Sequence, residues 1–219
     1  LTEEADMPLA VPQLIQRQAL RRELQQRMGG RSGLLPCIAV SRFPGSGAAT
    51  LAMDVARSLD YAFFGIEIVD RMARDGGMPR RIAAAFDEHV RNGIERYVVD
   101  AFREGAFVES DYLRHLVRTV RSIGEAGGAV LLGRGAPYIL PRERTLRVLV
   151  VAPKEARIES LAKARDLSPA EAAVELARED DERRRFLGYH FRVDPDDPTA
   201  CDLCVNTSLL PREAACAAV

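Results

Sequence analysis

A glycine-rich segment, Ser41-Arg-Phe-Pro-Gly-Ser-Gly-Ala-Ala-Thr50, offers the clearest chemistry in the chain. Successive backbone N–H groups in such a turn form a concave anion site, and the N-terminus of a following helix adds partial positive charge. Gly45 and Gly47 let a phosphate approach the backbone, and the hydroxyl of Thr50 suits a phosphate or Mg²⁺. The segment predicts a phosphate loop between a strand and a helix.

This loop departs from the usual pattern G-x-x-x-x-G-K-[ST] at two places. Arg42 stands where the first glycine is expected, and Ala48 stands where the lysine is expected. Loss of one phosphate-binding cation typically costs about 10²–10³ in rate. Arg42 is the candidate substitute, reaching over the loop from the strand end. Taken alone, the segment also fits a tight strand-to-helix turn that binds nothing.

Further arginines suit phosphate binding because a guanidinium grips two oxygens at once. Arg134 directly follows an apolar run, where a doubly wound sheet places its ligands. Arg157 lies early in a predicted helix, and Asp180-Asp-Glu-Arg-Arg-Arg-Phe186 ends a later one. The alternatives are a surface arginine in a turn for Arg134, a plain surface role for Arg157 and a solvated helix face for the charged run.

Short apolar runs alternate with helical patterns along the chain. The expected strands are Leu35–Ser41, Ala129–Leu132, Leu146–Ala152 and Asp202–Val205, with a further short strand at Tyr61–Phe64. Strands that alternate with helices imply a parallel sheet covered on both faces. The predicted fold class is therefore α/β, a three-layer sandwich. Residues 1–33 read as an N-terminal helical extension with a glycine-rich linker, and residues 34–219 as one domain.

Helical spacing of apolar residues dominates residues 66–127, and a second helical stretch begins near residue 168. Ser168-Pro-Ala-Glu171 has the form of a capping box with proline at the first helical position. We therefore expect a helix that starts at this point and carries the charged run at its end.

Together these motifs resemble the cytidylate kinase-like branch of the nucleoside monophosphate kinases. Pro44-Gly-Ser-Gly-Ala-Ala-Thr50 is similar to the kinase loop P-G-S-G-K-G-T, and Val40-Ser-Arg-x-x-Gly-Ser-Gly resembles the branch's lysine-free loop. The resemblance continues, in order and spacing from about residue 36 to 210, at Leu132-Gly-Arg-Gly-Ala136, Ala152-Pro-x-x-x-Arg157, Asp180-x-x-Arg183 and Asp202-Leu-x-x-Asn206-Thr-Ser208.

The resemblance implies ATP- and Mg²⁺-dependent phosphoryl transfer to a nucleoside monophosphate, with CMP or dCMP as the first acceptor to test. It implies a phosphate-loop kinase fold with a monophosphate-binding helical region at about 66–127 and a lid at about 168–195. The implied catalytic residues are Arg183, Arg184 and Arg134. The implied nucleotide-binding residues are Arg42, Gly45, Ser46, Gly47, Ala48, Ala49 and Thr50, and the implied substrate-binding residues are Arg134, Arg157 and Asp180.

Two departures from the family pattern keep a second interpretation open. Ala49 replaces the arginine that follows the glycines in this branch, and Gly135 replaces the aspartate of the G-R-D turn. The alternative is a catalytically degenerate module of the same fold that binds a nucleotide or regulates a partner.

The composition limits the classes of partner. A formal net charge of −1 gives no global attraction to nucleic acid polymers or anionic membranes, and no apolar run is long enough to cross a bilayer. Nucleotides are the expected ligands, and the N-terminal helix is a candidate docking element for a protein or domain. Four cysteines predict a reducing cytoplasm. Cys201 and Cys204, with His190 and Cys216, have metal-like spacing, but residues three apart on a strand face opposite sides, so we expect no metal site.

Overall fold

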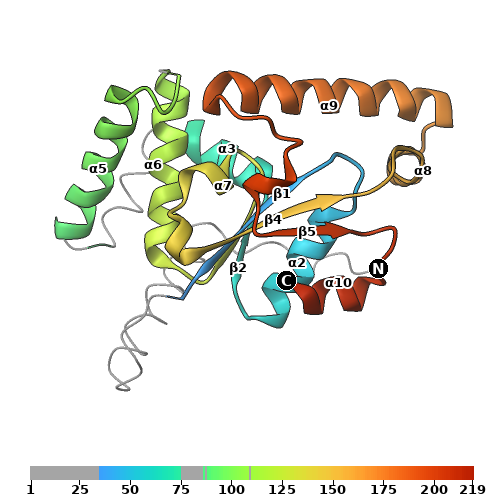
Figure 1. The fold of residues 1–219 in the computed structure, drawn as a ribbon, viewed down its shortest axis with the longest axis horizontal. Coiled ribbons are helices and arrows are strands. Elements are labelled where there is room, and N and C mark those ends of the chain that lie inside the picture. The colour runs from blue at the N-terminus through green and yellow to red at the C-terminus, as the bar shows by residue number, and fades with distance from the viewer. Residues whose placement is uncertain (1–34, 75–85, 87, 109) are drawn as a thin grey trace, which may run out of the picture.

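The computed structural model describes residues 35–74, 86, 88–108 and 110–219. The predicted N-terminal extension lies outside the described residues. A five-stranded parallel sheet in the order β2-β3-β1-β4-β5 forms the centre of the molecule (Figure 1). Its strands are β1 (Cys37–Arg42), β2 (Ala62–Phe64), β3 (Ala129–Leu132), β4 (Thr145–Val151) and β5 (Leu203–Asn206). The five predicted strands are confirmed, with boundaries that differ by one or two residues.

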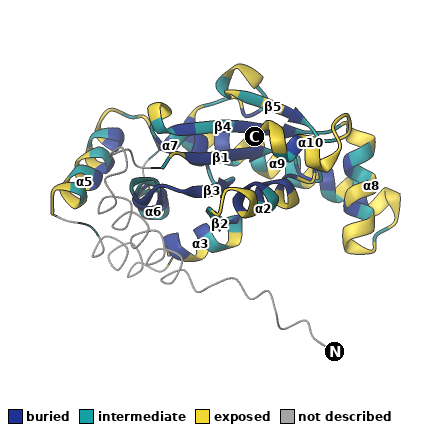
Figure 2. Ribbon diagram, turned by 90° about the horizontal axis from the view of Figure 1, so that it is seen from below, coloured by how far each residue is buried: buried dark blue, intermediate teal, exposed yellow. Residues whose placement is uncertain are grey.

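Side-chain alternation along the strands divides the core into two layers. In β1, Ile38 and Val40 face one cluster, whereas Cys37 and Ala39 face the other. Helices α2 (Ala48–Ser58) and α10 (Arg212–Ala218) cover the first face. The central strands β1 and β3 are buried on both sides, whereas the edge strand β5 has only Val205 buried, and exposed residues gather on the outer helices (Figure 2). The three-layer α/β architecture is thus confirmed.

The second face carries the helices that were expected between residues 66 and 127. These are α3 (Ile66–Arg74), α5 (Glu88–Arg103) and α6 (Asp111–Ala126), followed by the short α7 (Ala136–Ile139). The apolar stripe of α6 is fully buried, with Leu113, Leu116 and Val117 each at 0% exposure. The helical period therefore identified the core face of α6 correctly. Helix α7 was not predicted, because four residues are too few to show a helical period.

Helix α8 (Lys154–Arg165) follows β4 and packs against α9 (Pro169–Phe191), the long helix along the top of Figure 1. Leu161 of α8 meets Leu176 of α9 in a small separate cluster, whereas Leu187 and Phe191 reach the main core. Helix α9 therefore joins a solvated outer end to an inner end beside the sheet. Two short 3₁₀ turns, Arg142–Arg144 and Pro198–Ala200, complete the described elements. No helix in the described ranges has the length and apolar character of a membrane span.

The capping box at the start of α9 generates a stability prediction. Oγ of Ser168 accepts from the N–H of Glu171 at 3.3 Å, and the Glu171 carboxylate accepts from the N–H of Ser168 at 2.9 Å. We expect Ser168→Ala to lower the free energy of unfolding by about 1 kcal/mol, since the N–H of Glu171 loses its acceptor and the Glu171 carboxylate loses the hydroxyl of Ser168 as a donor. Urea unfolding of this variant and of Ser208→Ala, an exposed hydroxyl outside any helix, measures the difference. Equal stabilities would contradict the role of the cap.

Candidate functional site

The segment between β1 and α2 has the backbone geometry of an anion-binding loop. Gly45 and Gly47 adopt φ values of 76° and 73°, in the left-handed region that favours glycine. Within the described part of the chain, the N–H groups of Gly45 and of residues 47–50 donate to no backbone carbonyl. These groups surround the N-terminus of α2, which has no side-chain cap. The loop therefore presents a row of available donors at a positive helix end.

Three contacts hold this loop in place. The N–H of Phe43 donates to the carbonyl of Val150 at 3.0 Å, which continues the pairing of β1 with β4. Oγ1 of Thr207 donates to the carbonyl of Ser46 at 2.8 Å, and Nη1 of Arg157 donates to the carbonyl of Pro44 at 3.3 Å. Both residues belong to motifs that were expected to matter, and both contact the loop backbone. The carbonyls point away to these partners, so the N–H groups remain on the other side.

The two unusual residues of the loop face different surroundings. The methyl group of Ala48 is 1% exposed and packs on the core of the first face. The guanidinium of Arg42 points toward the turn after β3, where its Nη1 lies 3.6 Å from the position a Cβ would take at Gly133. Burial lowers the pKa of Arg42; the charges of Arg134 and Arg183 act in the same direction, and the carboxylates of Glu179 and Glu67 oppose them. Arg42 therefore lies in the pocket beside the loop, with two other cations near it.

A cavity of about 290 Å³ opens at this place, beside the carboxyl ends of β1 and β3. A parallel α/β sheet binds its ligands at such a position. Basic and acidic side chains alternate around it. The charged residues that line it are Arg42, Glu67, Arg134, Arg165, Arg178, Glu179, Glu182 and Arg183.

Arg134 enters this cavity from the turn after β3, as the sequence predicted for a ligand-binding residue. It adopts a left-handed φ of 51° between Gly133 and Gly135, which also have positive φ. Its Nη2 donates to Oδ2 of Asp70 at 2.5 Å, and the guanidinium lies 5.2 Å from the ring centre of Phe186. Its Nε is buried and has no hydrogen-bond partner among the described residues.

The three predicted lid arginines have different environments. Arg183 lines the cavity with a side chain 11% exposed, donates to Asp196 and to the carbonyl of Pro195 at 2.6 Å each, and keeps a buried Nε without a partner in the described chain. Arg184 binds the other oxygen of Asp196 at 2.9 Å but is 52% exposed, and Arg185 pairs with Asp181 at 81% exposure. Only Arg183 of the three lines the cavity, so Arg184 has weaker support as a catalytic residue.

Arg157 and Asp180 form a buried ion pair. Nη1 of Arg157 lies 2.9 Å and 3.1 Å from the two carboxylate oxygens of Asp180, and the side chains are 8% and 14% exposed. The guanidinium lies 5.2 Å from the ring centre of Phe43. Arg157 therefore does not have the plain surface role that was one alternative; the buried pair braces the site, because it ties α8, α9 and the phosphate loop together. Its direct contact with a substrate stays a prediction.

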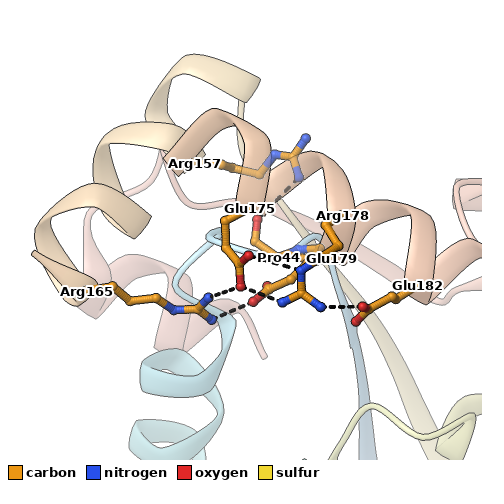
Figure 3. A network of polar contacts seen from close by, with 7 residues as sticks. All are labelled: Pro44, Arg157, Arg165, Glu175, Arg178, Glu179 and Glu182. Carbon is orange, nitrogen blue, oxygen red and sulfur yellow. Dashed lines mark hydrogen bonds and ion pairs between the residues drawn. The ribbon is translucent and has the colours of Figure 1, made fainter. Parts of the chain in front are cut away.

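Sequence reasoning missed a charged network on the cavity wall (Figure 3). Arg165 of α8 binds Glu175 at 2.8 Å and Glu179 at 2.5 Å, and Arg178 of α9 binds Glu175 and Glu182. Four of these residues line the cavity. In the sequence, one feature points to part of this network: Glu175, Arg178 and Glu182 have i,i+3 and i,i+4 spacing. The same spacing is equally typical of a solvated helix face.

The described residues contain no group of three or more His, Cys, Asp or Glu side chains that could hold a metal ion. Cys201, Cys204 and Cys216 are free thiols. The arrangement as a whole can hold a phosphate on the loop and a second anion in the cavity beside it, with cations between them.

The buried pair of Arg157 and Asp180 generates a second prediction. We expect Arg157→Met to lower the free energy of unfolding by about 3–5 kcal/mol, because it leaves the Asp180 carboxylate buried without a cation. The double variant Arg157→Met/Asp180→Leu should regain much of this loss. Arg165→Met, which removes a cation 44% exposed, is the control and should cost at most about 1 kcal/mol. Denaturant unfolding compares the variants, and equal losses at the two arginines would refute the bracing role.

Comparisons with known proteins give a consistent family. The model of the cytidylate kinase-like family matches residues 37–209. A cytidylate kinase of Halobacterium salinarum is 30% identical over 173 residues, covering 78% of this chain and 80% of that protein. A cytidylate kinase of Pyrococcus horikoshii is 28% identical over 174 residues, covering 78% and 79%.

The fold has a solved counterpart. An uncharacterized protein from Eubacterium ventriosum superimposes with a TM-score of 0.58 at 15% identity, over 84% of this chain and 94% of that one. This likeness concerns the fold alone. The family match covers the loop, the arginine turn and the α9 residues described above, and on that ground the chain belongs to the cytidylate kinase-like family.

Proposed function

We propose that this protein transfers the γ-phosphoryl group of ATP to a nucleoside monophosphate, with CMP or dCMP as the first acceptor. One observation carries the proposal. Arg42, Arg134 and Arg183 line one cavity beside the phosphate loop, and the last two each have a buried Nε without a partner in the described chain. Like charges repel, so three guanidinium groups in one cavity favour an anionic ligand. The names of the matched relatives support a cytidine nucleotide as that ligand.

For this reaction the protein has to position the two substrates and stabilise negative charge. The attacking atom is a phosphate oxygen of the acceptor, which is ionised at neutral pH, so no general base is required. Charge in the transition state spreads over the equatorial oxygens of the transferred group. Arg134 and Arg183 stabilise that charge with donors whose positions are already fixed. Arg42 enters from the strand end and contributes the cation that the loop lacks.

The residues present fit ATP and Mg²⁺. The donor row of the loop suits the β- and γ-phosphates. Mg²⁺ neutralises phosphate charge when bound, and it commonly keeps several waters and binds through substrate phosphates rather than a protein cage. The hydroxyl of Thr50, exposed at the start of α2, would be its protein ligand. Free thiols at all four cysteines fit the cytoplasm as the place of this reaction.

The donor row leads to a binding prediction. We expect Gly47→Val to abolish ATP and ADP binding, because valine disfavours the φ of 73° that aims the neighbouring N–H groups. A Cβ at residue 47 would meet nothing within 4 Å among the described atoms, so the effect reports on the backbone and not on a clash. Isothermal titration with ADP measures binding, and Gly93→Val, a glycine of α5 with similarly open surroundings, is the control. Unchanged ADP affinity in Gly47→Val would exclude the loop as the site.

A coupled kinase assay, which follows ADP formation over a panel of nucleoside monophosphates, tests turnover. One matched pair of variants tests the catalytic role of Arg183. Arg183→Gln should lower kcat/KM by about 10²–10³, since it removes a fixed cation at the cavity. Arg184→Gln removes an exposed cation from the same carboxylate, Asp196, and should change kcat/KM by less than about threefold. Equal effects of the two substitutions would argue against the catalytic role of Arg183.

A second function, nucleotide binding without turnover, is favoured by one observation. Ala48 stands where the loop lysine is expected, and its methyl group is buried. The loop therefore lacks the cation that would contact phosphate. This module would bind ADP through the loop yet form no product with any acceptor in the panel. The binding and turnover experiments together therefore separate the two functions.

A further inference from the structure

Asp70 on α3 connects the cavity to two helices behind it. Its Oδ2 accepts from Nη2 of Arg134 at 2.5 Å, and its Oδ1 accepts from the hydroxyl of Tyr112 at 2.6 Å. The Asp70 side chain is 16% exposed and that of Arg134 is 29% exposed. Asp70 and Tyr112 are not among the residues that line the cavity in the described chain. The carboxylate therefore lies behind the guanidinium and not against a ligand.

The guanidinium of Arg134 has contacts with Asp70 and Phe186. The residue lies between two glycines with positive φ, and one face of its guanidinium rests near the ring of Phe186. Asp70 occupies Nη2, whereas the buried Nε has no partner in the described residues. A guanidinium held at one end presents its remaining donors in a fixed direction, which is the condition for gripping an oxyanion with two parallel bonds.

The turn itself has no room for the carboxylate. A Cβ at Gly135 would lie 2.2 Å from a ring carbon of Phe191, and the residue adopts a φ of 71°. Both the buried phenyl ring and the backbone therefore exclude a carboxylate side chain at this place. Asp70 supplies a carboxylate to the same arginine from another element.

We propose that Asp70 is a positioning residue, which holds Arg134 so that its free guanidinium edge faces the anionic acceptor, and that the Tyr112 hydroxyl orients Asp70 in turn. The proposal rests on the proposed function for the identity of the acceptor. Burial, with the carboxylate of Asp70, raises the pKa of Tyr112, so its hydroxyl stays protonated and donates throughout the neutral range.

The opposite effect on anion binding follows if Asp70 merely masks Arg134. Loss of a carboxylate beside a cavity makes its potential more positive, which by itself tightens the binding of an anion. A masking carboxylate would also compete with the acceptor for Nη2. Positioning therefore predicts weaker anion binding in Asp70→Asn, whereas masking or plain electrostatics predicts tighter binding.

Steady-state kinetics of the full chain provide the first test. We expect Asp70→Asn to lower kcat/KM for CMP by about tenfold to a hundredfold, because a misplaced Arg134 guanidinium costs about this factor in rate. The KM for ATP should change less than twofold. Tyr112→Phe should show a smaller loss of the same kind, and Asp70→Glu should restore part of the activity. Thermal unfolding verifies that each variant is folded. A folded Asp70→Asn with unchanged or improved kcat/KM for CMP would overturn the proposal.

Titration with inorganic phosphate gives a readout that does not require turnover. The stabilisation of the wild-type chain by phosphate should fall in Asp70→Asn and in Arg134→Gln, and the double variant should be no worse than Arg134→Gln alone. If the wild type phosphorylates no monophosphate but this pattern appears, the proposed function fails and the positioning role stands. If phosphate binds Asp70→Asn as well as or better than the wild type, or if the two losses add, the positioning role fails whatever the acceptor.

Discussion

The guanidinium of Arg157 is the contact on which the rest of the site depends. It joins the carbonyl of Pro44 in the loop to the carboxylate of Asp180 in α9, across 113 residues of sequence on one side and 23 on the other. A buried ion pair is costly to desolvate, so it persists here only because each partner satisfies the other. Since α9 also carries Arg178 and Arg183, this one pair sets where those arginines lie relative to the loop.

The charges around the cavity are not equivalent. Arg165 and Arg178 are paired within the described chain with three carboxylates, so their part of the wall has no excess of positive charge; these are Glu175, Glu179 and Glu182. Arg42 forms no ion pair with any described residue, and Arg134 and Arg183 each use only part of their donor set. Guanidinium donors that no carboxylate uses within the described chain therefore lie on the arginines nearest the loop.

Local sequence predicted the features that local physics determines. The apolar runs of the strands and the capping box at Ser168 each act within a few residues, and both predictions are confirmed in the structure. The loop glycines have the positive φ that a phosphate loop requires, and their contact with phosphate stays a prediction. The same reading did not find Asp70 or Tyr112, because their pairing joins α3 to α6 and no period or motif marks it. The burial of Arg157 was also beyond reach, since an arginine early in an amphipathic helix is usually solvated and only the tertiary packing of Phe43 and Asp180 around it decides otherwise.

Thr207 donates to the carbonyl of Ser46 from 161 positions farther along the chain. This hydrogen bond requires β5 to be paired with β4 at the edge of the sheet, because Thr207 directly follows β5. During synthesis on the ribosome, the glycine-rich segment therefore emerges long before the residue that binds the Ser46 carbonyl. The partners of the other two loop contacts, Val150 and Arg157, emerge about 50 residues before Thr207, so this hydrogen bond is the last of the three that the growing chain can form.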